Sequence, residues 1–248
     1  MSAANQCRVE RVAVLGGGAA GAGVAQVLAV AGYEVTLCGE GEALALARNE
    51  VDGGRYGLLA ACDAGRISSG ERREALARLR FSEHPSETLG DADLVIVTPE
   101  GPPEATITLL ASIESALVPG AVLACNSEGD PVATLAAGLR RPERLVGWRW
   151  GWPTTTSKLA EIARSPSTSA EVTESVTEVA RRAGKNPVVI ADAPDAWGYV
   201  TNRVWSALRA EASRITDEGV ATAAQVDQLL VDCFGWPSGP FGRGARPH

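Results

Sequence analysis

A glycine-rich loop near the start of the chain is the feature that most limits its folds. Residues 16–21 read Gly-Gly-Gly-Ala-Ala-Gly, which satisfies the pattern G-x-G-x-x-G. The loop follows a short apolar run at 11–15 and precedes a proline-free segment at 19–31 that is rich in helix formers. This order predicts a strand, a tight turn and a helix.

The glycine at each G position of this pattern would have its own physical role. Gly16 would make the turn, Gly18 would let the backbone approach a pyrophosphate, and Gly21 would let the helix pack closely on the strand. The N–H groups at the start of the helix would then face the phosphates. The loop therefore predicts dinucleotide binding, and the alternative is a tight turn in an α/β protein that binds nothing.

The end of a second strand, predicted at 34–38, bears on the choice between NAD and NADP. An acidic residue is expected there to hold the adenosine ribose, but Gly39 stands at that place and Glu40 follows it. No arginine stands immediately beside Glu40 to receive a 2′-phosphate. The sequence therefore favours NAD with NADP as the alternative, and Glu40 is equally consistent with a surface role. Glu100 and Asn126 are further expected cofactor-binding residues.

Apolar runs and helical segments alternate through most of the remaining first part of the chain. Strands are expected at 94–97, 121–124, 145–148 and 188–190, helices at 103–117, 131–139 and 171–183, and two helices or a helical hairpin between 42 and 79. Such alternation predicts a parallel sheet with helices on both faces. The expected fold class is therefore α/β, with a Rossmann-type, doubly wound and mostly parallel sheet.

The sequence changes character at residues 193–196, which read Ala-Pro-Asp-Ala and are typical of a linker. Beyond them, helices are predicted at 202–218 and 222–231. We therefore expect a dinucleotide-binding domain over 1–193 and a short, truncated all-α domain over 194–248.

Composition excludes several classes of partner. The net charge of -7 and the lack of a basic run argue against nucleic acid and anionic membranes, which leaves a small molecule as the expected partner. The five cysteines are widely spaced without a C-x-x-C pair, so they predict neither disulfides nor a metal site. Residues 1–8 lack the apolar part of a signal peptide, and no apolar stretch is long enough to span a bilayer. These features predict a cytoplasmic protein.

Five blocks of the sequence resemble the 3-hydroxyacyl-CoA dehydrogenase family in order and in spacing. The blocks lie at 12–26, 92–96, 141–147, 198–203 and 235–241. The resemblance covers nearly the whole chain and implies an NAD-binding domain followed by a helical domain. Most of the family's later helices, which help to build its dimer, are missing. An apolar face over 204–215 still leaves a homodimer as an expected assembly.

The resemblance also assigns the catalytic positions. The family uses a histidine as general acid/base, a glutamate that aligns it, and a serine and an asparagine that contact the substrate oxygen. In residues 147–153, Gly-Trp-Arg-Trp-Gly-Trp-Pro, Arg149 stands where the family has its histidine. Glu161 matches the aligning glutamate, and Asn202 matches the asparagine. Glu128 takes the place of the serine.

Arginine at this position changes the expected chemistry. Its guanidinium stays protonated at working pH and cannot exchange a proton as imidazole does, so ordinary hydroxyacyl oxidation is expected to be badly impaired. Arg149 can still polarise a carbonyl or anchor a carboxylate. With Glu161 and Glu128 it forms a predicted charge cluster, in which a desolvated Glu128 would be suited to acid/base work. The alternative is a structural ion pair that remains after loss of function.

Aromatic residues beside Arg149 predict a changed substrate pocket. Strand alternation places Trp148 and Trp150 on the face opposite Arg149, where core packing is the favoured interpretation. Trp152 replaces a polar residue of the family, so it is the candidate wall of an enlarged or flattened pocket that suits an aromatic ligand. Tyr199 stands where the family usually has phenylalanine, and it is either a proton donor or a packing substitution.

The sequence supports three functional hypotheses. The first is an NAD(P)-dependent oxidoreductase that acts on a keto or hydroxy group in specialised biosynthesis. Its substrate is expected to lack CoA, since residues 53–60 offer only Arg55 to the CoA phosphates. The second is a non-redox cyclase, dehydratase or isomerase that reuses the fold, with Glu128 or Glu161 as base. The third is a ligand-binding homologue without catalysis.

Overall fold

The computed structural model describes residues 9–193 and 197–242. The chain divides into two compact units, residues 1–196 and 197–248, and each is described by itself. The predicted domain boundary falls next to residues 194–196, which lie outside the described residues. The N-terminal segment that was considered as a signal peptide lies outside them too.

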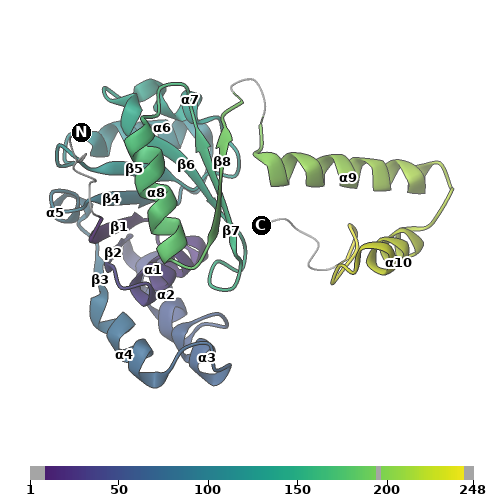
Figure 1. Ribbon diagram of the computed structural model, residues 1–248, viewed down its shortest axis with the longest axis horizontal. Helices are drawn as coiled ribbons and strands as arrows, with labels where there is room; N and C mark the ends of the chain where they lie inside the picture. The colour runs from purple at the N-terminus through teal and green to yellow at the C-terminus, as the bar shows by residue number, and fades with distance from the viewer. Residues whose placement is uncertain (1–8, 194–196, 243–248) are drawn as a thin grey trace, which may run out of the picture. The chain divides into compact units, whose positions relative to one another are not determined.

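The described residues of the first unit form one eight-stranded sheet (Figure 1). Its strands run in the spatial order β3-β2-β1-β4-β5-β6-β7-β8, and every neighbouring pair is parallel except β6 and β7. The strands are β1 (Arg11–Leu15), β2 (Glu34–Cys38), β3 (Leu79–Ser82), β4 (Leu94–Val97), β5 (Val122–Cys125), β6 (Leu145–Trp150), β7 (Leu159–Arg164) and β8 (Asn186–Ala191). The order confirms the predicted doubly wound, Rossmann-type sheet.

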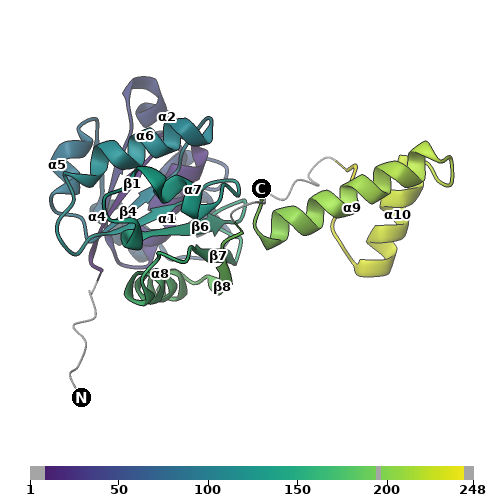
Figure 2. The same cartoon turned by 90° about the horizontal axis from the view of Figure 1, so that it is seen from above.

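Helices cover both faces of this sheet, and Figure 2 shows α6 and α8 on opposite sides of it. The helices of the first unit are α1 (Ala19–Val30), α2 (Gly41–Gly53), α3 (Leu58–Asp63), α4 (Ser69–Arg78), α5 (Pro85–Leu89), α6 (Pro103–Glu114), α7 (Val132–Leu135) and α8 (Ala170–Arg182), with 3-10 turns at Ala136–Gly138 and Pro142–Arg144. Three helices, rather than the predicted two, lie between residues 41 and 78. Gly54 ends α2, Gly57 caps α3, and Ser68 begins α4 with a capping box.

Two strands were missed by the sequence interpretation. Strand β3 follows α4 without an intervening turn, so no local signal separates them. Strand β7 reads Leu-Ala-Glu-Ile-Ala-Arg, a sequence rich in helix formers. Its residues become a strand because β6 and β8 pair with it on both sides.

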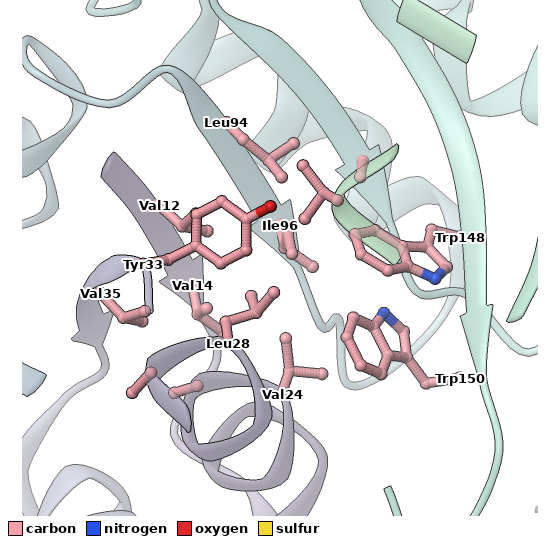
Figure 3. Close-up of a cluster of buried hydrophobic side chains, with 14 of the residues drawn as sticks. Val12, Val14, Val24, Leu28, Tyr33, Val35, Leu94, Ile96, Trp148 and Trp150 are labelled. Atoms are coloured by element: carbon pink, nitrogen blue, oxygen red, sulfur yellow. The ribbon is translucent and has the colours of Figure 1, made fainter. Parts of the chain in front are cut away.

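The main core lies between the sheet and helices that include α1 and α8. Val12 and Val14 of β1 face Leu28 of α1 in this core (Figure 3). Trp148 and Trp150 of β6 belong to the same cluster, with stacked rings whose centroids are 4.4 Å apart. Core packing is therefore confirmed for these two tryptophans, and their neighbour Arg149 is left for the other face of the sheet.

The second unit contains helices α9 (Val200–Asp217) and α10 (Ala223–Phe234), as predicted. Thr222 and Gln225 form a capping box at the start of α10, and Gly235 ends that helix in the left-handed region. Val204 and Leu229 are 65% and 64% exposed, so large apolar side chains lie on the surface of both helices. Among the residues that the structure describes, no helix combines the length and apolarity needed to cross a bilayer.

Candidate active site

The glycine loop joins the end of β1 to the first turn of α1, and its backbone requires glycine. Gly16 has a φ of +136°, and a Cβ added there would overlap the Thr98 side chain. A Cβ on Gly21 would overlap the Gly16 carbonyl oxygen. Thr98 is buried and its hydroxyl donates to the Leu15 carbonyl at 3.2 Å, which holds the end of β4 against the loop.

The N-terminus of α1 is open to a ligand. Gly18 is the N-cap residue, provides no side-chain cap, and is followed by a first turn without acidic residues. A Cβ on Gly18 would overlap the Glu100 carboxylate, so the backbone there forms a shallow cradle that a side chain would fill. The first N–H groups of a helix have no partner within the helix, and together with the positive end of the helix dipole they suit a diphosphate at this place.

A cavity of about 470 Å³ adjoins the loop at the carboxyl ends of β1, β2 and β4. Gly16, Glu40 and Glu100 all line it, so the structure brings these three predicted cofactor residues together. The strand order reverses between β1 and β4, which is where open α/β sheets bind their ligands. The cradle and the cavity together fit a dinucleotide.

Asn126 follows β5 and connects three strand ends. Its backbone N–H donates to the Val97 carbonyl at 2.8 Å, and its side-chain oxygen accepts from the Trp150 N–H at 3.1 Å. Asn126 therefore holds the end of β6 beside the end of β4, next to Arg149. Asn126 does not line the cofactor cavity, and the cofactor contact that the sequence predicted for it stays a prediction.

Arg149 and Glu161 form the centre of the candidate site. They occupy paired positions of the antiparallel strands β6 and β7, with Arg149 Nε 3.8 Å from Glu161 Oε2. Each side chain is only 5% exposed. The pairing brings together the two residues that stand at the catalytic histidine and glutamate positions of the resemblance. A fixed, buried positive charge with a directional hydrogen-bond fork can stabilise an oxyanion or hold a carboxylate.

The other predicted catalytic residues do not lie in the buried Arg149–Glu161 pair. Glu128 lies on the loop after β5 with an exposed side chain, so the desolvated setting that its proposed acid/base role required is not found. Asn202 lies in the first turn of α9, and Tyr199 is the N-cap residue of that helix. Both belong to the second unit, so only Arg149, Glu161 and Glu128 are held by the first unit.

Trp152 lies beyond the end of β6 and is 38% exposed. Its ring meets the Tyr56 ring edge to face, with centroids 5.9 Å apart and planes at 83°. The Tyr56 carbonyl accepts a hydrogen bond from the Gln26 side chain at 3.1 Å, which anchors it to α1. Tyr56 was not predicted as a site residue, because no local pattern in the sequence links it to Trp152.

Lys185 is a second residue that the sequence interpretation missed. It is buried, its Nζ donates to the carbonyl oxygens of Thr154 and Ser157, and it lies 5.3 Å from the centre of the Trp150 ring. Burial, together with the positive charge of Lys158, lowers the pKa of Lys185 to about 8. Lys185 therefore fixes the turn that joins the strands of Arg149 and Glu161. The signal in the sequence was the rarity of lysine, since Lys158 and Lys185 are the only two.

Comparison with known families identifies both units. Residues 11–193 match the NAD-binding domain of 3-hydroxyacyl-CoA dehydrogenase, and residues 198–245 match the C-terminal domain of the same enzymes. The first match indicates NAD as the cofactor, which agrees with the fit of the glycine cradle. The alternative of NADP, left open by the sequence, has no such support.

Curated relatives include the 3-hydroxyadipyl-CoA dehydrogenase of Escherichia coli, which is 33% identical over 234 residues. The fatty acid oxidation complex subunit alpha of Pseudomonas savastanoi is 32% identical over 239 residues. Each alignment covers 94% of this chain but only 48% and 31% of these relatives, respectively. The chain therefore spans about half of the first protein and a third of the second.

Solved structures also resemble this chain in fold and in sequence. FadB2 of M. tuberculosis has a TM-score of 0.85 at 31% identity, with 94% of this chain and 80% of that one covered. The 3-hydroxybutyryl-CoA dehydrogenase of E. coli has a TM-score of 0.86 at 32% identity, with 94% and 48% covered. With family models matched in both units and these relatives alike in sequence and fold, the chain belongs to the 3-hydroxyacyl-CoA dehydrogenase family of NAD-dependent oxidoreductases.

Proposed function

We propose that this chain interconverts a keto and a hydroxy group on a substrate other than a CoA thioester, within a biosynthetic pathway. The observation that carries the proposal is the buried Arg149–Glu161 pair, in which a guanidinium stands at the position of the family's catalytic histidine. A guanidinium donates hydrogen bonds at every working pH but does not exchange protons. The site therefore favours a reaction in which carbonyl polarisation matters more than proton transfer by this residue.

NADH would supply a hydride to the carbonyl carbon of the substrate, and the carbonyl oxygen would then take up one proton. In this step Arg149 donates a hydrogen bond to the oxygen as negative charge develops on it. Glu161 orients the guanidinium from the neighbouring strand. Asn202 is proposed as a second donor to the oxygen, and Tyr199 as the group that delivers the proton.

Two features of the first unit support a substrate without CoA. Residues 53–60 carry one basic side chain, Arg55, and its guanidinium lies 5.3 Å from the centre of the Tyr56 ring. Trp152 adds a second ring at the same place, so this surface offers aromatic faces more than phosphate ligands. The relatives with CoA thioesters in their names show the substrate class from which this chain is proposed to depart.

Cofactor binding and turnover test the proposal in two steps. Titration of the chain with NADH, followed by tryptophan fluorescence, is expected to show saturable binding. NADH consumption is then measured with acetoacetyl-CoA and with a panel of aryl β-keto acids that lack CoA. Faster turnover of an aryl keto acid supports the proposal. Lack of NADH binding, or a clear preference for acetoacetyl-CoA, contradicts it.

A second candidate is a non-redox enzyme, such as a cyclase, dehydratase or isomerase. The observation that favours it is again the Arg149–Glu161 pair, because a guanidinium can polarise a carbonyl without hydride transfer while a carboxylate such as Glu161 serves as base. Conversion of a substrate that persists after the nucleotide is removed would establish this candidate. Stoichiometric consumption of NADH would exclude it. Loss of both activities, with ligand binding retained, would leave a binding protein.

We also propose a homodimer built on the second unit. Val200 and Val204 on α9, and Leu229 and Phe234 on α10, are each more than half exposed. Large apolar side chains exposed on both helices favour burial against a second copy. Sedimentation at increasing protein concentration is expected to show a dimer, and Val204→Lys is expected to weaken it.

We propose the cytoplasm as its location. The described cysteines are free thiols, and Cys38 and Cys125 among them are buried. Free, unpaired thiols are typical of a reducing compartment. Localisation of a tagged full-length protein tests this, and export from the cytoplasm would contradict it.

A further inference from the structure

A second hollow lies apart from the cofactor cavity, between α1, α3, the end of α8 and the turn that joins β6 to β7. Its volume is about 620 Å³, and all of its lining residues belong to the first unit. Val27, Val30, Leu58 and Ile67 give it an apolar part on α1 and around α3. Its remaining walls carry basic and hydroxyl groups, so the hollow is amphipathic.

Four cationic side chains line this hollow: Arg66, Lys158, Arg182 and Lys185. No Asp or Glu is among its lining residues, although the chain has a net charge of -7. None of the ion pairs found within the described parts of the chain includes any of the four. Positive charge is therefore gathered here without a carboxylate in the lining or in an ion pair with any of the four cations.

Three of these cations, Lys158, Arg182 and Lys185, donate hydrogen bonds to backbone carbonyl oxygens. Lys158 Nζ donates to the Gly184 carbonyl at 2.9 Å, and Arg182 Nε donates to the Ala31 carbonyl at 3.1 Å. A carbonyl oxygen accepts a hydrogen bond but leaves the net charge unchanged. The lowered pKa of Lys185 has the same origin, since burial and a like charge both disfavour its ammonium form.

The residue types in this hollow suit a phosphate. Both lysines of the chain line it, and an ammonium is a common ligand of phosphate oxygens. Thr155, Thr156 and Ser157 add hydroxyl groups to the same lining. The Thr155 hydroxyl is buried without a hydrogen-bond partner, a state that costs free energy until a partner is supplied.

We propose that this hollow binds an organic phosphate, with the phosphate group among the four cations and the apolar part of the molecule along α1 and α3. A phosphate carries up to two charges and three terminal oxygens, so it matches several donors at once. The apolar residues favour a ligand with a hydrocarbon portion over a free ion. The hollow shares no lining residue with the cofactor cavity, so the two sites are separate.

Calorimetric titration of the full chain with three probes tests the chemistry of the ligand. The probes are decyl phosphate below its micelle concentration, inorganic phosphate, and decanoate. Decyl phosphate is expected to bind saturably and at least about tenfold more tightly than either of the others. Equal binding of decanoate would overturn the assignment to phosphate, and equal binding of inorganic phosphate would overturn the apolar part. Absence of saturable binding by decyl phosphate would overturn the whole proposal.

A matched pair of variants tests the position of the site. Lys158→Met removes an exposed cation that lines the hollow, and it is expected to weaken decyl phosphate binding roughly tenfold, the loss typical of one charge-assisted hydrogen bond. Arg181→Met removes a cation that does not line the hollow and is paired with Glu178, so it is expected to change nothing. Equal binding by the Lys158 variant and the wild type would contradict the proposal. NADH titration of each variant shows separately whether the cofactor cavity is intact.

Discussion

Arg149 and Glu161 lie directly opposite each other on β6 and β7, and both side chains are almost fully buried. Neither residue can lose its charge without leaving the other charge in the protein interior. Arg149→Met is therefore expected to lower the free energy of unfolding of the first unit by about 3–5 kcal/mol, the usual cost of an uncompensated buried charge. Urea denaturation followed by near-UV circular dichroism measures this change.

The double variant Arg149→Met, Glu161→Gln is the control for that measurement. It removes both charges at once, so its loss of stability is expected to be smaller than that of Arg149→Met alone. If the double variant is as unstable as the sum of the two single variants, the charges do not interact and the pair is not the centre of this site.

A substitution at Gly18 tests whether the glycine cradle binds the pyrophosphate of the cofactor. A side chain at Gly18 would meet only the movable end of Glu100, so Gly18→Val is expected to fold but to obstruct a pyrophosphate. NADH affinity measured by fluorescence is expected to fall at least about tenfold. Gly90→Ala is the matched control, because no atom lies within 4 Å of a Cβ at that position. Unchanged NADH binding by the Gly18 variant would place the cofactor elsewhere.

A substitution at Glu40 tests whether this side chain recognises the adenosine ribose of the cofactor. It lines the cofactor cavity at the end of β2, where an acidic side chain favours NAD and an arginine favours NADP. Glu40→Arg is expected to shift the ratio of NADH to NADPH affinity toward NADPH by at least about tenfold. Parallel titrations with the two nucleotides give this ratio. An unchanged ratio would assign Glu40 to the surface role that the sequence also allowed.

The lowered pKa of Lys185 leads us to predict how the stability of the chain depends on pH. Its pKa is about 8 in the folded chain against 10.5 for an ordinary lysine, so the unfolded chain binds more protons between these values. The free energy of unfolding is therefore expected to rise through this window, by on the order of 2–3 kcal/mol in total. The difference between wild type and Lys185→Met, measured from pH 7 to pH 10.5, isolates this contribution. A flat or falling difference would contradict the assignment.

Much of the first unit could be predicted from local sequence. The loop at Gly16–Gly21 lies between a strand and a helix as expected, because turn glycines and apolar runs are short-range signals. Strand β7 could not be predicted in this way. Its helix-forming residues are held extended by two neighbouring strands, and such pairing is a long-range effect.

In the candidate site, too, some residues could be predicted from the sequence and others could not. Arg149 and Glu161 were found from blocks of sequence that resemble a known family, and the structure confirms that they pair. The hollow around Lys158 and Lys185 was not found, because helices α1, α3 and α8 bring its residues together from distant parts of the chain. The rarity of lysine does not by itself predict a site, and only the structure shows that both lysines line one hollow.

Arg149 stands in place of a proton-exchanging residue, and we propose that this substitution changed the reaction. The most direct measurement is the single-turnover rate of NADH oxidation with the acetoacetyl thioester of N-acetylcysteamine, which carries the reacting carbonyl without the CoA nucleotide. Arg149→His restores a titrating group opposite Glu161, and it is expected to raise this rate about 100-fold over wild type, the usual effect of general acid/base catalysis. A wild-type rate equal to or above that of the Arg149→His variant would contradict the account.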